Sequence, residues 1–238
     1  MNLEILISTM NGKFQSRATT PPLPYILIDQ ISPDRGLAKS RNLAIAQSNA
    51  TICLISDDDL EYIEGIEDSI LNAFRDNPKA DIITFEVQTP DNRPYKRYKT
   101  EPFWHTKKSI MSVSSVEIAF KKDSFSRVNL KFDERFGLGG EFPTGEEIIL
   151  LSDALSSGLK ILFIPIPIVM HPIESSGKDY DNPTLIRAKG AMFYRIFSLL
   201  GYGASLLFAF KKYKISPYSM LEFYRLMLKG IEDYRSKR

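Results

Sequence analysis

Several features that mark particular protein classes are scarce or missing in this chain. Its 238 residues include one cysteine, which excludes an internal disulfide framework, and only two histidines. No G-x-G-x-x-G follows the first apolar run and no Walker-type G-x-x-x-x-G-K-S/T occurs, which weakens interpretations as a dinucleotide-binding or P-loop protein. A net charge of +2 argues against a nucleic-acid binder that relies on a basic surface. No internal repeat is visible.

The N-terminal residues also lack the basic region and long apolar segment of a secretory signal, so we expect a cytoplasmic protein. With 43% hydrophobic and 25% charged residues, the chain has enough apolar side chains for a real core. Its length suits one α/β domain with an appendage, or at most two small domains. Cys53 falls within an apolar run, and we interpret it as a small buried hydrophobic residue.

Short apolar runs alternate with segments of helical periodicity along the first part of the chain. The runs predict strands at Leu3–Ser8, Tyr25–Asp29, Thr51–Ile55, Asp81–Val87, Ser114–Phe120 and Lys160–Ile168. Pro165 and Pro167 place the last run at a sheet edge or in a loop. Apolar residues at helical spacing predict a helix over Glu61–Asn77. The alternation indicates an α/β fold with a mostly parallel sheet flanked by helices.

Three consecutive carboxylates, Asp57, Asp58 and Asp59, follow the strand predicted at Thr51–Ile55. Open α/β sheets bind ligands at the carboxyl ends of their strands. Adjacent carboxylates repel one another unless a cation lies among them, and Mg²⁺ and Mn²⁺ prefer oxygen ligands. The alternative is a solvated acidic turn in which an aspartate caps the next helix.

A second acidic pair, Glu146 and Glu147, follows the glycine-rich segment Phe132–Gly140 and opens a predicted helix. The glycines allow a close approach of the backbone to a ligand. The alternative interpretation is electrostatic, because a helix N-terminus favours acidic residues by itself.

These motifs resemble those of family 2 glycosyltransferases, which have the GT-A fold. In that family a segment of the form G-L-(S/A)-x-(A/S)-R-N precedes a strand that ends in D-x-D, and an F-D-E-x-F glycine-rich loop leads into a G-E-D helix. The matching residues are Gly36, Leu37, Ala38, Ser40, Arg41 and Asn42, then Asp57–Asp59, then Phe132–Gly140 and Gly145–Glu147. The resemblance covers about residues 3 to 175.

The resemblance implies roles for individual residues. Asp57 and Asp59 would hold Mn²⁺ or Mg²⁺, and His171 would complete the metal shell. The general base would be Glu147, although a glutamate stands where aspartate is commoner, so the choice between Glu147 and Glu146 stays open. The donor-binding residues would be Thr9, Asn11, Asp29, Arg41 and Asp58. Arg41 would either face the diphosphate or brace the acidic turn.

The implied activity is metal-dependent transfer, with inversion, of a sugar from a nucleotide-diphosphate sugar to a hydroxyl acceptor. A saccharide or lipid-linked saccharide acceptor would fit the family's usual work in surface polysaccharide synthesis, and no nucleic-acid partner is expected. Two alternatives stay open. A sugar-nucleotide nucleotidyltransferase should have a glycine-rich, arginine-containing loop, which Ser8–Phe14 lacks. The second alternative is a catalytically silent subunit that binds a nucleotide or another protein.

The character of the chain changes near its C-terminus, so we divide it into a catalytic domain at 1–180 and a helical extension at 181–238. Gly190–Phe210 carries only Arg195 as a charge, but that arginine and a helix break at Gly201–Gly203 argue for two amphipathic helices rather than a membrane span. Pro217 starts a further helix to about Tyr234. The extension would pack on the catalytic domain, form a homodimer, or lie on the inner face of the plasma membrane through Lys211, Lys212 and Lys214.

Overall fold

The computed structural model describes residues 1–9, 22–29, 36–171 and 179–237. The strands are β1 (Leu3–Thr9), β2 (Tyr25–Asp29), β3 (Ile52–Asp57), β4 (Glu61–Tyr62), β5 (Ile82–Gln88), β6 (Phe103–Trp104), β7 (Ile118–Lys121) and β8 (Ile161–Met170). The helices are α1 (Leu37–Gln47), α2 (Ile66–Asp76), α3 (Lys122–Val128), α4 (Glu146–Ser156), α5 (Pro183–Phe197), α6 (Leu200–Lys212) and α7 (Met220–Ser236).

The described strands form one mixed sheet in the order β2-β1-β3-β7-β5-β8-β4, with β6 paired to β8. Parallel pairing joins β1 to β2 and β3, and β5 to β8. β7 lies antiparallel between β3 and β5, and β4 and β6 are antiparallel to β8. The predicted α/β class is confirmed, but the sheet is mixed rather than mostly parallel.

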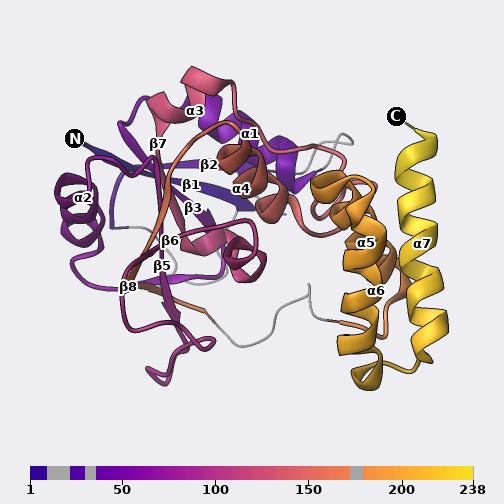
Figure 1. The fold of residues 1–238 in the computed structure, drawn as a ribbon. Coiled ribbons are helices and arrows are strands. Elements are labelled where there is room, and N and C mark those ends of the chain that lie inside the picture. The colour runs from indigo at the N-terminus through magenta and orange to yellow at the C-terminus, as the bar shows by residue number, and fades with distance from the viewer. Residues whose placement is uncertain (10–21, 30–35, 172–178, 238) are drawn as a thin grey trace.

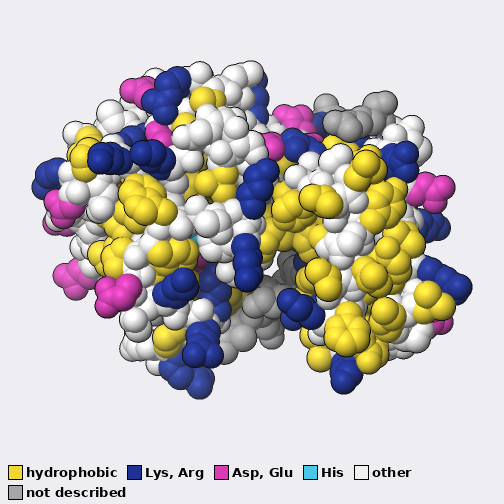
Figure 2. Space-filling view, in the orientation of Figure 1, with side chains coloured by type: hydrophobic (Ala, Val, Ile, Leu, Met, Phe, Trp, Pro, Cys, Tyr) yellow, Lys and Arg dark blue, Asp and Glu magenta, His cyan; other side chains and the backbone are white. Residues whose placement is uncertain are grey.

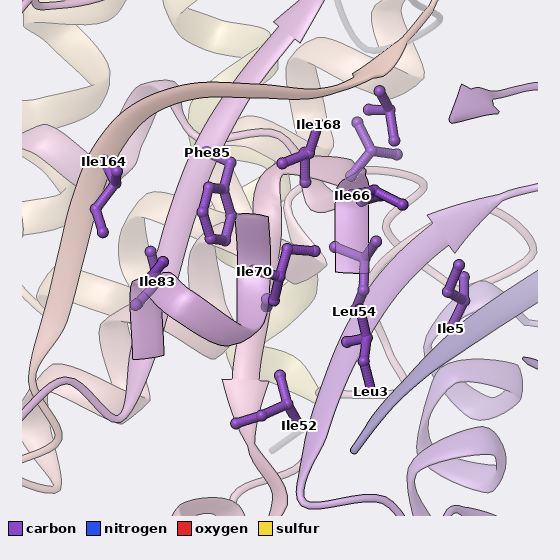
Figure 3. Packing of buried hydrophobic residues seen from close by; sticks show 14 of the residues in the cluster. Leu3, Ile5, Ile52, Leu54, Ile66, Ile70, Ile83, Phe85, Ile164 and Ile168 are labelled. Carbon is purple, nitrogen blue, oxygen red and sulfur yellow. The ribbon is translucent and has the colours of Figure 1, made fainter. Parts of the chain in front are cut away.

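Helices cover both faces of the sheet (Figure 1). Because successive side chains of a strand point to opposite faces, β1 contributes to two separate cores. Leu3, Ile5 and Ile7 pack with α2 on one face, while Leu6 packs with α1, α3 and α4 on the other. Figure 3 shows the first of these cores, in which strand residues such as Leu54 and Phe85 surround Ile70 of α2. Cys53 is fully buried in the second core, as predicted.

The helix predicted over Glu61–Asn77 is wrong at its start. Glu61–Tyr62 instead forms β4, which pairs with Val169 and Met170 at the end of β8. Helix α2 begins only at Ile66, after Gly65 in the left-handed conformation. The apolar residues of the segment do repeat at helical spacing, but the pairing partner of its first residues lies more than 100 positions further along the chain and leaves no local signal.

The prediction that the last apolar run lies at a sheet edge or in a loop holds only for its middle, around the two prolines. β8 is a ten-residue strand between β5 and β4. Its prolines are tolerated because β6 pairs only with Leu162 and Phe163, and β4 only with Val169 and Met170. The intervening residues, which include both prolines, have no paired strand opposite β5, and the pairing with β5 shifts register there.

The C-terminal helices α5, α6 and α7 form a helical unit beside the sheet (Figure 1). Its buried residues share one hydrophobic cluster with Phe136, Phe142 and Ile148 from the preceding segment, as expected for an extension that packs on the rest of the chain. The break between the first two helices falls at Ser198, with φ 53°, and the predicted break at Gly201–Gly203 is wrong because these residues lie within α6. None of the helices in the described ranges is long and apolar enough to cross a membrane.

Candidate active site

The acidic turn lies at the carboxyl end of β3, as predicted. Asp57 is the last residue of this strand and pairs in register with Ser8 of β1. Asp58 and Asp59 form the turn that follows, and all three carboxylates are partly exposed. The hydroxyl of Ser40 in α1 donates to Ser8 Oγ at 2.8 Å, which ties the start of α1 to this edge of the sheet.

Arg41 of α1 joins the acidic turn to the second acidic motif. Its guanidinium donates to Asp57 Oδ1 at 3.0 Å and to Glu146 Oε1 at 2.8 Å, and only 2% of the side chain is exposed. The ring of Phe132 lies 5.5 Å from the guanidinium carbon. The contacts with these carboxylates raise the pKa of Arg41 despite its burial. Arg41 therefore braces the acidic turn, which is one of the two roles that the sequence left open.

Asn42, the next residue, joins α1 to the F-D-E loop. Its amide nitrogen donates to the Phe132 carbonyl at 3.0 Å and to Glu134 Oε1 at 3.1 Å, while its amide oxygen accepts from the Phe132 backbone N–H at 2.8 Å. The Leu138 carbonyl accepts from the first N–H of α1 at 2.8 Å. The segment Gly36–Asn42 therefore holds the two acidic motifs at fixed positions relative to each other.

The glycine-rich loop passes closely over the second acidic motif. Gly137 has φ 93°, and a Cβ at this position would lie 3.1 Å from the carboxyl carbon of Glu146. Glycine is therefore needed for both the backbone conformation and the space. Behind the loop, Asp133 accepts from Arg195 Nε at 2.9 Å, and the same guanidinium donates to both carboxylate oxygens of Asp153 in α4. The lone charge of Gly190–Phe210 thus anchors the helical unit to this loop.

The paired glutamates at the N-terminus of α4 have different environments. Glu146 is buried and accepts from Arg41. Glu147 is partly exposed, and burial followed by the neighbouring charge of Glu146 raises its pKa to about 8. A carboxyl group with a pKa near neutrality suits general acid–base chemistry, whereas a carboxylate held in a buried ion pair does not exchange protons readily.

His171 and Asp59 lie side by side, although they are 112 positions apart in the sequence. His171 Nε2 is 3.7 Å from Asp59 Oδ1, and Asp59 Oδ1 is buried with no hydrogen-bond partner. Burial raises the pKa of Asp59, and the charges of Asp57 and Asp58 add to this. The pairing of β4 with β8 brings the two residues together. The His171 backbone N–H also donates to the Gln88 carbonyl at 2.8 Å, and Tyr95 packs edge-on against the imidazole.

The donor set at this position fits a divalent cation. A carboxylate oxygen that is desolvated and unpartnered, facing an imidazole nitrogen, is a favourable environment for a positive charge. No group of three or more His, Cys, Asp or Glu side chains within the described ranges is arranged to hold a metal ion. Mg²⁺ commonly takes one or two protein ligands and completes its shell with water and substrate phosphates, which is compatible with the pair found here.

Of the remaining predicted donor-binding residues, some lie within the described ranges and one does not. Thr9 is buried at the end of β1 and pairs in register with Asp29 at the end of β2, so their backbones reach the same edge as the acidic turn. Asp58 lies in the turn itself. Asn11 lies outside the described residues. Sequence reasoning missed the bridging role of Asn42 and the packing of Tyr95 on His171; the R-N pair in the first motif was the available signal for Asn42.

The fold is the GT-A fold, an α/β arrangement with a mixed sheet, flanking helices and an acidic turn at the sheet edge. It is similar to crystal structures of S. aureus TarS. The structure of TarS residues 1–349 has a TM-score of 0.60 at 12% identity, with 100% of this chain and 92% of that chain covered. Its complex with UDP-GlcNAc has a TM-score of 0.59 at 13% identity, with 100% of this chain and 93% of that chain covered. Its complex with UDP has a TM-score of 0.56 at 14% identity, with 88% of this chain and 70% of that chain covered. At this identity the likeness shows the fold alone. The sequence matches no protein-family model and no curated protein.

Proposed function

We propose that the protein is a glycosyltransferase that moves a sugar from a nucleotide-diphosphate sugar to a hydroxyl group of a saccharide or lipid-linked saccharide. The observation that carries the proposal is the buried Arg41 bridge, which holds the acidic turn and the start of α4 at one edge of the sheet. The complexes of TarS with UDP and UDP-GlcNAc make uridine diphosphate the first nucleotide to test. Inversion of configuration, a cytoplasmic location and a role in surface polysaccharide synthesis are parts of the same proposal.

Each residue of the site has a defined task in this proposal. Glu147 accepts the proton of the acceptor hydroxyl as the new bond to the anomeric carbon forms and the bond to the diphosphate oxygen breaks. Glu146 keeps its ion pair with Arg41 and raises the pKa of Glu147. Asp59 and His171 would hold Mn²⁺ or Mg²⁺, while Asp57 keeps its contact with Arg41 beside them. When bound, the ion offsets the negative charge of the diphosphate leaving group.

Calorimetric titration with a panel of nucleoside diphosphates, with and without Mn²⁺, tests the donor site. We expect Mn²⁺-dependent binding of one nucleotide, and its loss in Asp59→Ala. This variant should fold normally, because Asp59 Oδ1 makes no hydrogen bond. Asp76→Ala is the matched control, since it removes an exposed carboxylate from the end of α2. If no nucleotide binds under any metal condition, the acidic turn is structural and the proposal fails.

Turnover assays separate the proposal from its alternatives. Release of UDP from a UDP-sugar, with nucleotide binding intact and turnover lost in Glu147→Gln, would support the transferase. Release of pyrophosphate from a nucleoside triphosphate and a sugar phosphate would instead support a nucleotidyltransferase. Nucleotide binding without any turnover, unchanged by Glu147→Gln, would support a silent subunit.

A further inference from the structure

Helix α6 buries small residues on one side and exposes several large apolar residues on the other. Gly201, Ser205 and Ala209 repeat at intervals of four and face the interior of the helical unit. On the opposite side, Leu200 is 79% exposed, Leu207 65% and Phe210 67%. A helix that only packed on a protein core would show the reverse arrangement, because burying large apolar side chains contributes most to stability.

The small residues of α6 allow a close approach to α5. A Cβ at Gly201 would lie 2.7 Å from the Phe193 carbonyl oxygen and from the Tyr194 Cα. The position of α6 is therefore fixed by backbone contact. Phe208 packs against the cluster of the helical unit, while Leu200, Leu207 and Phe210 point outward. We call the outward side the α6 apolar face; it consists of Leu199, Leu200, Leu206, Leu207 and Phe210. Figure 2 shows apolar side chains over much of the visible face of the helical unit, with charged side chains of both signs at its margins.

The charged side chains that adjoin this face along α6 and the segment after it are all basic, and Asp179 and Asp181 lie beyond them, on either side of Tyr180. Lys211, Lys212 and Lys214 follow Phe210, and no aspartate or glutamate occurs anywhere in residues 182–221. Lys211 and Lys214 are exposed and have no acidic neighbour in their own segment. Ile215, beside them, is also exposed. Apolar side chains next to exposed lysines are complementary to a bilayer surface that presents acyl chains and anionic headgroups.

We propose that the α6 apolar face docks on the surface of a bilayer that contains anionic lipids. With 13 residues, α6 is about 20 Å long, too short to cross the hydrocarbon core of about 30 Å, so it lies in the plane of the interface. A second copy of this chain is the less favoured occupant, because it would bury the same lysines without supplying an acid from the corresponding segment. The inference does not depend on the chemistry at Glu147 and Asp59.

Flotation of the purified protein with lipid vesicles tests the proposal. We expect it to float with vesicles of phosphatidylcholine and phosphatidylglycerol and to bind vesicles of phosphatidylcholine alone much more weakly. Leu207→Ser with Phe210→Ser should lower the partition coefficient on the order of a hundredfold, because two large apolar side chains no longer insert. Trp104→Ser is the matched control, since it removes an exposed aromatic residue from β6, and it should leave the binding unchanged.

The lysines are tested separately. Lys211→Gln with Lys214→Gln should lower binding to the anionic vesicles on the order of tenfold and flatten its salt dependence. Lys79→Gln with Lys107→Gln removes the same charge from exposed positions elsewhere and should have no such effect. All of these positions are exposed, and circular dichroism checks that the variants fold.

Three results would overturn the proposal. The first is a native protein that does not float with anionic vesicles. The second is binding that survives Leu207→Ser with Phe210→Ser. The third is a dimer, seen by light scattering without vesicles, that dissociates in this variant while vesicle binding is absent; this would assign the face to a second copy.

Discussion

Arg41→Met tests whether the buried bridge supports the fold as well as the site. Methionine keeps an apolar stem beside Phe132 but cannot donate to Asp57 or Glu146. Two charge-assisted hydrogen bonds are lost, at 2.8 and 3.0 Å, and each contributes about 1.5–3 kcal/mol. The side chain of Glu146, only 8% exposed, is then left without its cation. We expect the free energy of unfolding to fall by about 3–5 kcal/mol, the usual cost of breaking a buried ion pair.

The destabilisation should depend on pH in a defined direction. Arg41 lowers the pKa of the neighbouring Glu147, so without this cation the ionised form of Glu147 becomes more costly and part of the lost stability returns as the pH falls. Urea unfolding followed by circular dichroism, in mildly alkaline and mildly acidic buffers, measures both effects. We therefore expect the difference between the native protein and the variant to be larger in the alkaline buffer.

Arg75→Met in α2 is the matched control. Arg75 is exposed and donates one hydrogen bond to Asn72, so its replacement should change the free energy of unfolding by no more than about 0.5 kcal/mol. Arg41→Lys should fall between the two, because an ammonium group can reach one carboxylate but not hold both in the same geometry. A loss below about 1 kcal/mol for Arg41→Met, or one independent of pH, would refute the reasoning.

Two further predictions concern Glu147 and the helical unit. The pKa of Glu147 is raised to about 8, above its value in the unfolded chain. Between these two pKa values the native state keeps a proton that the unfolded state has lost, so the free energy of unfolding falls as the pH rises. Glu147→Gln should remove this part of the slope in pH-dependent urea unfolding. If the proposed transfer occurs, kcat/KM of the native protein should rise with pH up to about 8. A flat profile in both measurements would contradict the assignment. A Cβ at Gly230 of α7 would overlap the Arg187 backbone of α5, so Gly230→Ala should cost about 1–3 kcal/mol. At Gly203 a Cβ meets open space, so Gly203→Ala should raise the free energy of unfolding by about 0.5–1 kcal/mol. Equal melting temperatures for the two variants would argue against the close packing of α5 and α7.

The strands and the two acidic motifs were predictable because their signals are local. β1, β2, β3 and β5 are short apolar runs, and their positions agree with the prediction to within a few residues. The acidic turn follows β3 in sequence, so its place at the carboxyl edge required only the direction of the strand. Helix α4 was indicated by its apolar spacing after Glu146 and Glu147.

The errors occurred where pairing or packing over long sequence distances decides the structure. The two residues of β4 form a strand only because the end of β8 lies beside them. Pro165 and Pro167 lie on a stretch of β8 that is paired only with β5, because β6 and β4 pair with the two ends of the strand, and this arrangement carries no local signal. Gly201 remains helical because α6 needs a small residue where it approaches the backbone of α5, and Gly203 lies within the same helix at an exposed position.

The sequence by itself determined the α/β class, the acidic turn and the helix that begins with Glu146, since each depends on neighbouring residues. Only the tertiary structure decided what Arg41 and Asp59 contact. Arg41 meets Glu146 across 105 positions, and Asp59 meets His171 across 112. Contacts of this kind depend on how the whole sheet is ordered, and periodicity along the chain carries no information about them. The same holds for α6, whose exposed side is determined by where Gly201, Ser205 and Ala209 pack.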